Sequence, residues 1–525
     1  MTSSASTRIA RSTGVLALAT GASRILGFVR DIFLAGLFGT GVQAQAFVVA
    51  FRLPNLLRDL VAEGAVTSAF VPVLSWYRAK GRVEEFWRLS QALLTRVLVV
   101  VCAAGLAGTL AAPAIVRLIA PGFAEDPEKL ALTVRLTRIL FPFVALVGLW
   151  AYFMGLLNSL RHFAAPALGP AILNLAMIAA CVWFAPRTTP GILAVAIAVM
   201  VGGVVQLAVQ LPVAARLGFR WRWRWRHPGS AEVMRLLGPR TVGAAAYQAS
   251  VLVHTALASL GGVVGEGAVA ALYFANRLVQ LPLALFGTAS AQASLPLLSE
   301  QAAQEDLAAF RATLLAVLRM VGFVMLPSTA GLMVLAFPIV GGLFERGAFD
   351  HRSTVMTAQA LICYALGLVA YAVAKVLTGA FYALRDTRTP VRLAVEAVAV
   401  NLLLSLALMR PLQVNGLALA AVAANTLNAL RLVRGLERRL GAPLLQPVVP
   451  ALTRQAGASA LMGLGCWAAW GAGLSGCPSW LGLLLVILAG LVGYAVSCRL
   501  FRVQELGSVV RWLGNPPLLQ PFASE

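Results

Sequence analysis

Charged residues are scarce in this sequence, and acidic residues are the scarcest of them. Only 12% of the 525 residues are charged, with 20 Asp and Glu against 42 Lys and Arg. A soluble domain carries roughly 25% charged residues, so the composition excludes an ordinary soluble globule. Hydrophobic residues make up 60% of the chain, and the mean hydropathy is +0.84. Apolar runs of membrane-spanning length recur from end to end, which predicts an all-α polytopic membrane protein.

Motifs of enzymes and metal proteins are also missing. The four histidines are scattered without an HExxH pattern, and the sequence has neither a P-loop nor a GxSxG elbow. No CxxC or CxH spacing indicates a metal site among the six cysteines, which are Cys102, Cys181, Cys363, Cys466, Cys477 and Cys498. We therefore expect that the chain is not an enzyme and that it has no metal and no cofactor.

The apolar runs predict about fourteen transmembrane helices. Their expected limits are 11–37, 42–75, 89–118, 131–158, 164–184, 190–214, 233–260, 267–298, 316–343, 354–383, 391–409, 415–434, 451–472 and 480–500. The loops on one side, together with the termini, hold 26 Lys and Arg, whereas the loops on the other side hold 5. The positive-inside rule then predicts that both termini are cytoplasmic. The basic balance reflects topology, so a nucleic-acid partner is not expected.

A short internal repeat divides the chain into two blocks of six spans. Residues 50–53 (AFRL) recur as 275–278 (ANRL). At nearly the same offset, residues 71–75 (VPVLS) recur as 295–299 (LPLLS). Such repeats often build the two halves of a transporter. We predict an N-terminal lobe, a basic Trp/Arg linker, a C-terminal lobe, and a last region of two helices with a cytoplasmic tail, at residues 1–217, 218–230, 231–440 and 441–525.

The linker contains alternating arginine and tryptophan at residues 220–226. Indole rings at headgroup depth, with guanidinium groups on phosphates, suit the surface of an anionic leaflet. A simple topology anchor between the sixth and seventh spans is the alternative interpretation.

Six basic residues lie deep in the predicted spans, where a charge costs about 3 kcal/mol. They outnumber the acids of the same spans, Asp31, Asp59 and Glu63. The excess suits a phosphate-bearing substrate, because arginine binds phosphate through two parallel hydrogen bonds. Internal ion pairs are the structural alternative, since Asp31 shares a helical stripe with Arg24. The six basic residues are Arg24, Arg30, Arg52, Arg58, Arg277 and Lys375.

These residues are not equally strong candidates. We favour substrate binding for Arg24, Arg30, Arg58 and Arg277, whereas Arg52 and Lys375 fit a structural role equally well. Asp31 and Glu63 are assigned structural or gating roles.

The first seventy residues contain the most distinctive pattern in the chain. It comprises SRILGFVRD, AFVVAFRLPNLLR, AEGA and AFVP, at residues 23–31, 46–58, 62–65 and 69–72. Further matching stretches are residues 120–123, 166–174, 276–278 and 375–377. With this pattern, the sequence closely resembles the MurJ (MviN) family of bacterial lipid II flippases over essentially its whole length. The resemblance implies two pseudo-symmetric six-helix lobes around a central cavity, and two C-terminal helices that hold a lipid tail.

The resemblance also implies a function, within the multidrug, oligosaccharidyl-lipid and polysaccharide exporter superfamily. The family moves lipid II, an undecaprenyl-diphosphate-linked disaccharide pentapeptide, to the outer leaflet of the bacterial inner membrane by alternating access, in support of cell wall biosynthesis. The family's cavity arginines fall on Arg24, Arg30, Arg58 and Arg277. Expected partners are lipid II, anionic membrane lipids and the peptidoglycan synthesis machinery, with the chain acting as a monomer.

Several positions depart from the family. Gln45, Asn276 and Gln280 stand where relatives can have acids, which implies a more positive cavity and leaves the coupling ion open. The residues also leave three other functions open. These are a flippase for another polyprenyl-diphosphate oligosaccharide, a drug exporter, and a non-transporting scaffold for cell-wall enzymes.

Overall fold

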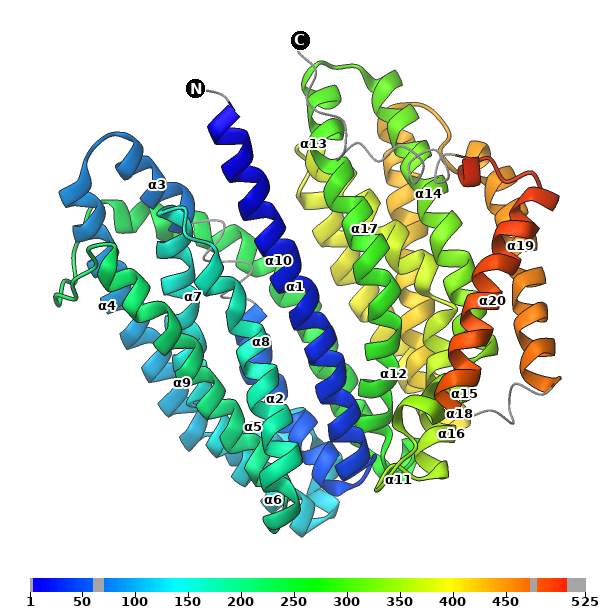
Figure 1. The fold of residues 1–525 in the computed structure, drawn as a ribbon, viewed down its shortest axis with the longest axis horizontal. Coiled ribbons are helices and arrows are strands. Elements are labelled where there is room, and N and C mark those ends of the chain that lie inside the picture. The colour runs from blue at the N-terminus through cyan, green and yellow to red at the C-terminus, as the bar shows by residue number, and fades with distance from the viewer. Residues whose placement is uncertain (1–2, 60–69, 473–478, 508–525) are drawn as a thin grey trace. The chain divides into compact units, whose positions relative to one another are not determined.

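The computed structural model describes residues 3–59, 70–472 and 479–507, and every regular element in these ranges is helical (Figure 1). This confirms the predicted all-α class. A helix satisfies its own backbone hydrogen bonds, which is what a chain of this composition requires in lipid. Glu63 lies outside the described residues.

The chain forms two compact units, one made of Met1–Ala270 and Arg346–Asp350, the other of Ala271–Glu345 and His351–Glu525. Helices up to α11 belong to the first unit: α1 (Ser3–Phe38), α2 (Val42–Asp59), α3 (Val71–Ala79), α4 (Val83–Leu110), α5 (Ala112–Ile119), α6 (Pro127–Leu140), α7 (Phe143–Ser159), α8 (Ala164–Ala179), α9 (Ile192–Arg216), α10 (Gly229–Ala258) and α11 (Gly261–Val264). The lobe limits expected from the repeat remain a prediction.

From α12, which begins three residues before the boundary, the helices belong to the second unit: α12 (Ala268–Pro282), α13 (Ala289–Ala303), α14 (Leu307–Val334), α15 (Ala336–Phe344), α16 (His351–Ala365), α17 (Leu368–Ala383), α18 (Arg388–Leu440), α19 (Leu445–Gly471) and α20 (Ser479–Leu500). A π-helical segment, Leu283–Thr288, joins α12 to α13.

Many of these helices are long and apolar enough to cross a membrane. Within the described ranges, eight helices or joined helices meet this criterion, and α16 with α17 adds a ninth span bent by 46°. Helix α18 contains two of the predicted spans, 391–409 and 415–434, and its helical geometry is broken at Gln413, where φ is 50°. The membrane-spanning helical architecture is thus confirmed, while the count of fourteen remains a prediction.

Small residues allow the helices of the first unit to pack closely. A Cβ atom on Gly148 of α7 would lie 2.4 Å from Val101 Cγ1 of α4, so only glycine fits this crossing. Close backbone approach through small residues is how membrane helices gain packing energy where lipid tails compete with apolar side chains. Nearby, the buried hydroxyl of Tyr152 donates a hydrogen bond to the Ser90 carbonyl oxygen at 2.8 Å. The core between α4 and α7 is therefore both tightly packed and hydrogen-bonded.

In the second unit, α19 packs against α14 and α20. The buried core between these helices includes Phe323, Met462 and Tyr494. The Tyr494 hydroxyl donates a 2.7 Å hydrogen bond to the Phe323 carbonyl oxygen, which ties α20 to α14. The last two helices are consequently part of the second unit's core rather than a loosely attached tail.

Candidate functional site

Arg30 is held in a buried ion pair in the first unit. Its side chain lies in α1, and Arg30 and Asp31 are only 7% and 2% exposed. Arg30 Nη2 and Nε donate to Asp31 Oδ1 at 2.7 and 3.1 Å, and Nη1 donates to Asn174 Oδ1 at 3.0 Å. Two charged side chains that are this deeply buried are tolerated only when they are paired and hydrogen-bonded. The guanidinium of Arg30 therefore connects α1 to α8.

Asn174 contacts α1 a second time. Its Nδ2 donates a hydrogen bond to the Ser23 carbonyl oxygen at 3.0 Å. A Cβ atom on Gly27 would lie 3.3 Å from that same Nδ2, so the glycine leaves room for the amide. The stretch from Ser23 to Asp31, which is part of the family pattern, thus includes a docking site for α8.

The structure pairs Asp31 with its neighbour Arg30, whereas the helical stripe suggested Arg24 as a partner. Arg24 is exposed, and within the described ranges its guanidinium makes no hydrogen bond and no ion pair. Arg24 and Arg30 of α1 therefore differ: Arg30 is paired and buried, whereas Arg24 presents its charge at the surface.

The basic residues of α2 are half-buried. Arg52 Nε donates a hydrogen bond to Thr255 Oγ1 at 3.1 Å, which joins α2 to α10. Arg58 lies in the last turn of α2 and is also half-buried. Its position six residues after Arg52 directs the two side chains to different sides of the helix. Arg52 therefore has a structural contact, in keeping with the structural role left open for it.

In the second unit, Arg277 lies against an aromatic ring of its own helix. Its Nη2 donates a hydrogen bond to the Tyr273 hydroxyl at 3.1 Å, and its Cζ is 5.0 Å from the centroid of the Tyr273 ring. The two residues are four apart in α12, the spacing at which helical side chains meet. Tyr273 therefore restricts the rotamers of a half-buried guanidinium while leaving its charge in place.

Lys375 lies elsewhere in the same unit. Its Nζ donates a hydrogen bond to Thr288 Oγ1 at 2.8 Å, from α17 to the end of the π-helical segment. Thr288 follows Arg277 by eleven residues, which corresponds to a rise of about 16 Å along a helix. Lys375 is therefore held by a residue well along the chain from Arg277, and the two cations have different hydroxyl partners.

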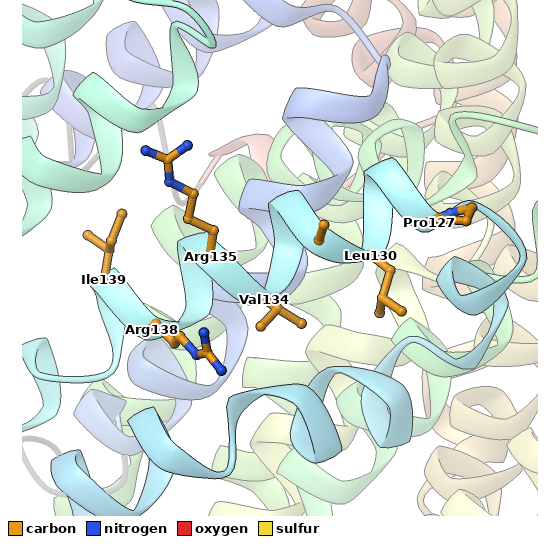
Figure 2. A pocket seen from close by; sticks show the side chains of 7 residues that line it. Pro127, Leu130, Val134, Arg135, Arg138 and Ile139 are labelled. Carbon is orange, nitrogen blue, oxygen red and sulfur yellow. The ribbon is translucent and has the colours of Figure 1, made fainter.

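One open depression of about 500 Å³ lies along α6 in the first unit. Its lining comes from α6 alone, and Arg135 and Arg138 point away from the helix in different directions (Figure 2). None of the six predicted substrate-binding residues lines it. Both arginines lie close to residue 131, where the predicted fourth span begins, and long basic side chains near a span end extend toward polar surroundings.

Sequence reasoning missed the neutral partners of the basic residues. Asn174, Thr255, Tyr273 and Thr288 all bind one of the six basic side chains. The contact between Tyr273 and Arg277 could have been predicted, because residues four apart in a helix lie side by side. The other contacts join helical segments that are distant in sequence. In the part of the chain that the structure describes, no three His, Cys, Asp or Glu side chains cluster in a way that could hold a metal ion.

Comparison with known protein families gives one consistent result. The family model described as lipid II flippase MurJ matches residues 34–475. A protein of Burkholderia cenocepacia named lipid II flippase MurJ is 35% identical over 423 residues, covering 79% of this chain and 81% of that protein. A probable lipid II flippase MurJ of Vibrio cholerae is 32% identical over 521 residues, covering 96% and 97% of the two chains.

Solved structures agree on the fold. A structure described as lipid II flippase MurJ in an inward closed conformation superposes with a TM-score of 0.78 at 24% identity, covering 93% of this chain and 98% of the other. An inward-facing multidrug transporter of the MATE family, in the MOP superfamily, superposes with a TM-score of 0.67 at 13% identity, covering 80% and 94%. At these identities the structural likeness supports the fold alone.

Proposed function

Because this chain belongs to the lipid II flippase MurJ family, we propose that it moves lipid II from the inner to the outer leaflet of the bacterial inner membrane by alternating access. The observation that carries this proposal is the family match, which extends over residues 34–475. The chain is a transporter of the inner membrane and not an enzyme. Its contribution to cell wall biosynthesis is to deliver the precursor to the outer face.

The physical problem is the head group. A diphosphate with sugars and a peptide cannot enter hydrocarbon without losing its hydration, which is prohibitively costly for charged groups. We propose that arginines replace part of this hydration at the diphosphate, with Arg24, Arg58 and Arg277 as direct ligands. Arginine suits this role, because its planar guanidinium can form two parallel hydrogen bonds to a phosphate.

Arg277 is the best-defined of these ligands. Its contact with Tyr273 holds the guanidinium before substrate arrives, which lowers the entropy lost on binding. Arg24 is exposed and needs no rearrangement to meet an anion. Lys375 and Arg52 are proposed as secondary contacts that would have to exchange their hydroxyl partners for substrate oxygens.

Arg30 is different, because its guanidinium is already bound to Asp31 and Asn174. A direct role requires the diphosphate to replace one of these partners during the transport cycle. We therefore propose that Arg30 binds substrate only in a state where α1 has moved relative to α8, with Asp31 as its structural partner in the present state. Glu63 keeps its proposed structural or gating role.

The remaining assignments belong to the same proposed function. We propose that both termini are cytoplasmic, that the chain acts as a monomer among anionic lipids, and that the peptidoglycan synthesis machinery is its functional partner. The polyprenyl tail would lie on α19 and α20, where Leu464, Trp467 and Leu491 are exposed apolar side chains. An apolar tail can stay there in contact with lipid while the head group crosses.

Complementation tests this function directly. The wild-type chain should restore growth to a bacterial strain depleted of its own lipid II flippase. Arg277→Ala should fail to do so at normal protein levels, since the loss of hydrogen bonds to a charged group costs about 1.5–3 kcal/mol each. Arg277→Lys should be intermediate, because lysine keeps the charge but not the two-pronged geometry.

Arg434→Ala is the matched control, because Arg434 is an exposed arginine of α18 outside the proposed ligand set. It should complement as well as the wild type. Failure of the wild-type chain itself to complement would count against the function, whereas normal growth with Arg277→Ala would count against that residue only.

A further inference from the structure

The segment Arg220–Arg226, here called the Arg/Trp segment, joins α9 to α10 and has no regular secondary structure. Its three indoles are strongly exposed, with Trp221 at 60%, Trp223 at 63% and Trp225 at 48%. Within the described ranges, its four guanidinium groups make no hydrogen bond and no ion pair. Three exposed indoles and four unpaired cations on seven residues form a surface that no contact within the described protein explains.

The segment is fixed at both ends. Before it, the Phe219 ring packs against Trp87 and Phe153, with centroid separations of 6.3 and 5.4 Å. After it, the buried His227 Nε2 lies 2.8 Å from Glu85 Oε2. The exposed indoles are therefore not the result of an unattached loop.

Hydrogen bonds from α4 also hold the backbone of the segment, which lies beside this helix (Figure 1). Gln91 Nε2 donates to the Arg220 carbonyl oxygen at 2.9 Å, and Arg96 Nε donates to the Trp225 carbonyl oxygen at 3.1 Å. The Arg224 N–H donates a further hydrogen bond to Thr95 Oγ1 at 3.3 Å, so α4 holds three backbone groups of the segment while its indoles are exposed. A preformed surface of this kind loses little conformational entropy when it binds.

We propose that the Arg/Trp segment binds the phosphate head groups of anionic phospholipids in the leaflet that it faces. Tryptophan prefers the headgroup region of a bilayer, where its ring is in apolar surroundings and its N–H is hydrated. Guanidinium groups bind phosphate, and each basic residue near an anionic surface strengthens binding roughly five-fold. The alternation gives both kinds of group along one short stretch.

The position of the segment favours a lipid over a protein partner. Helix α9, a candidate membrane span, ends at Arg216, four residues before the segment begins. The indoles are therefore tethered close to the membrane surface. Glu85, which contacts His227 at the end of the segment, also pairs with Arg88, and no ion pair joins it to an arginine of the segment in the described ranges. An anion from outside the protein is the complementary ligand.

Quenching by brominated lipids tests this proposal on the full-length chain. One copy of the protein is placed in each nanodisc of phosphatidylcholine, and brominated phosphatidylglycerol or brominated phosphatidylcholine is then titrated in. In the wild type, tryptophan fluorescence should be quenched at lower mole fractions of the anionic lipid. Arg222→Gln/Arg226→Gln should weaken the apparent affinity for phosphatidylglycerol about 25-fold.

The matched control is Arg434→Gln/Arg438→Gln, which removes two exposed arginines of α18 from the side predicted to hold the segment. It should keep the preference for the anionic lipid. Replacing the three indoles of the segment with phenylalanine should remove the part of the quenching specific to phosphatidylglycerol, which identifies them as the reporters.

Three results would overturn the proposal. They are equal quenching by the two lipids in the wild type, a preference that survives Arg222→Gln/Arg226→Gln, and a preference that survives removal of the indoles. Because each disc holds one copy, a surface meant for a second copy or for a protein partner would give the first of these results.

Discussion

Replacing Asp31 with leucine should destabilise the first unit strongly, because it leaves the Arg30 charge buried without its carboxylate. Arg30 and Asp31 are 7% and 2% exposed, and they are joined at 2.7 and 3.1 Å. Removing one partner of a buried ion pair costs about 3–5 kcal/mol, most of which comes from the unpaired charge that remains. Asp31→Leu should therefore lower the thermal unfolding midpoint of the purified protein well below that of the wild type.

The double variant Arg30→Met/Asp31→Leu separates charge from packing. Replacing both members of a buried pair with apolar side chains of similar volume is often neutral or stabilising. Asn174 would lose one hydrogen bond, at a cost of about 1 kcal/mol. We therefore expect the double variant to recover most of the stability that Asp31→Leu loses.

Two outcomes would refute this reasoning. If Asp31→Leu were as stable as the wild type, the pair would not be a buried structural element. If the double variant were as unstable as the single one, lost packing rather than an unpaired charge would be the cause. The stable double variant also tests substrate binding, since normal lipid II flipping by it would exclude Arg30 as a necessary ligand.

Two further predictions concern other contacts. Tyr273→Phe keeps the ring beside Arg277 but removes the hydroxyl that accepts its hydrogen bond. The flipping rate measured in a complemented strain should therefore fall about two- to ten-fold. Tyr273→Leu also removes the ring and should reduce the rate further. In the connection before α18, partial burial opposes the charge on Asp386, but hydrogen bonds from Thr389 and the charge of Arg439 outweigh it and hold the pKa of Asp386 below its ordinary 3.8. The carboxylate therefore stabilises the folded state fully above its ordinary pKa, and this stabilisation is lost as the pH falls through the lower pKa of the folded state. At neutral pH, Asp386→Ala should have a lower thermal unfolding midpoint than the wild type, and at strongly acidic pH the two midpoints should be equal.

The helical class and the membrane-spanning character were predictable from the sequence, because few charges and recurring apolar runs leave little choice of structure. The division of α18 was also foreseen, since a connection was expected between residues 409 and 415 and the helical geometry breaks at Gln413. These features depend on local composition, which periodicity and hydropathy describe well.

The partners of the basic residues were harder to predict. Helical periodicity paired Asp31 with Arg24, but Asn174 of another helix holds Arg30 where it can reach its neighbouring carboxylate. Arg52 and Lys375 likewise find their hydroxyl partners on other helices. Such contacts depend on how helices pack, and spacing within one helix contains no information about them. The substrate roles of all six basic residues remain proposals.

The most direct test of the central claim is the transbilayer distribution of lipid II in a strain depleted of its own flippase. Cells that express the wild-type chain should show lipid II accessible to a reagent confined to the outer face. Cells that express Arg24→Ala/Arg277→Ala at the same level should accumulate it in the inner leaflet, as the depleted strain does. The account would be contradicted if the wild-type chain left lipid II in the inner leaflet, or if the double variant exposed it as fully as the wild type.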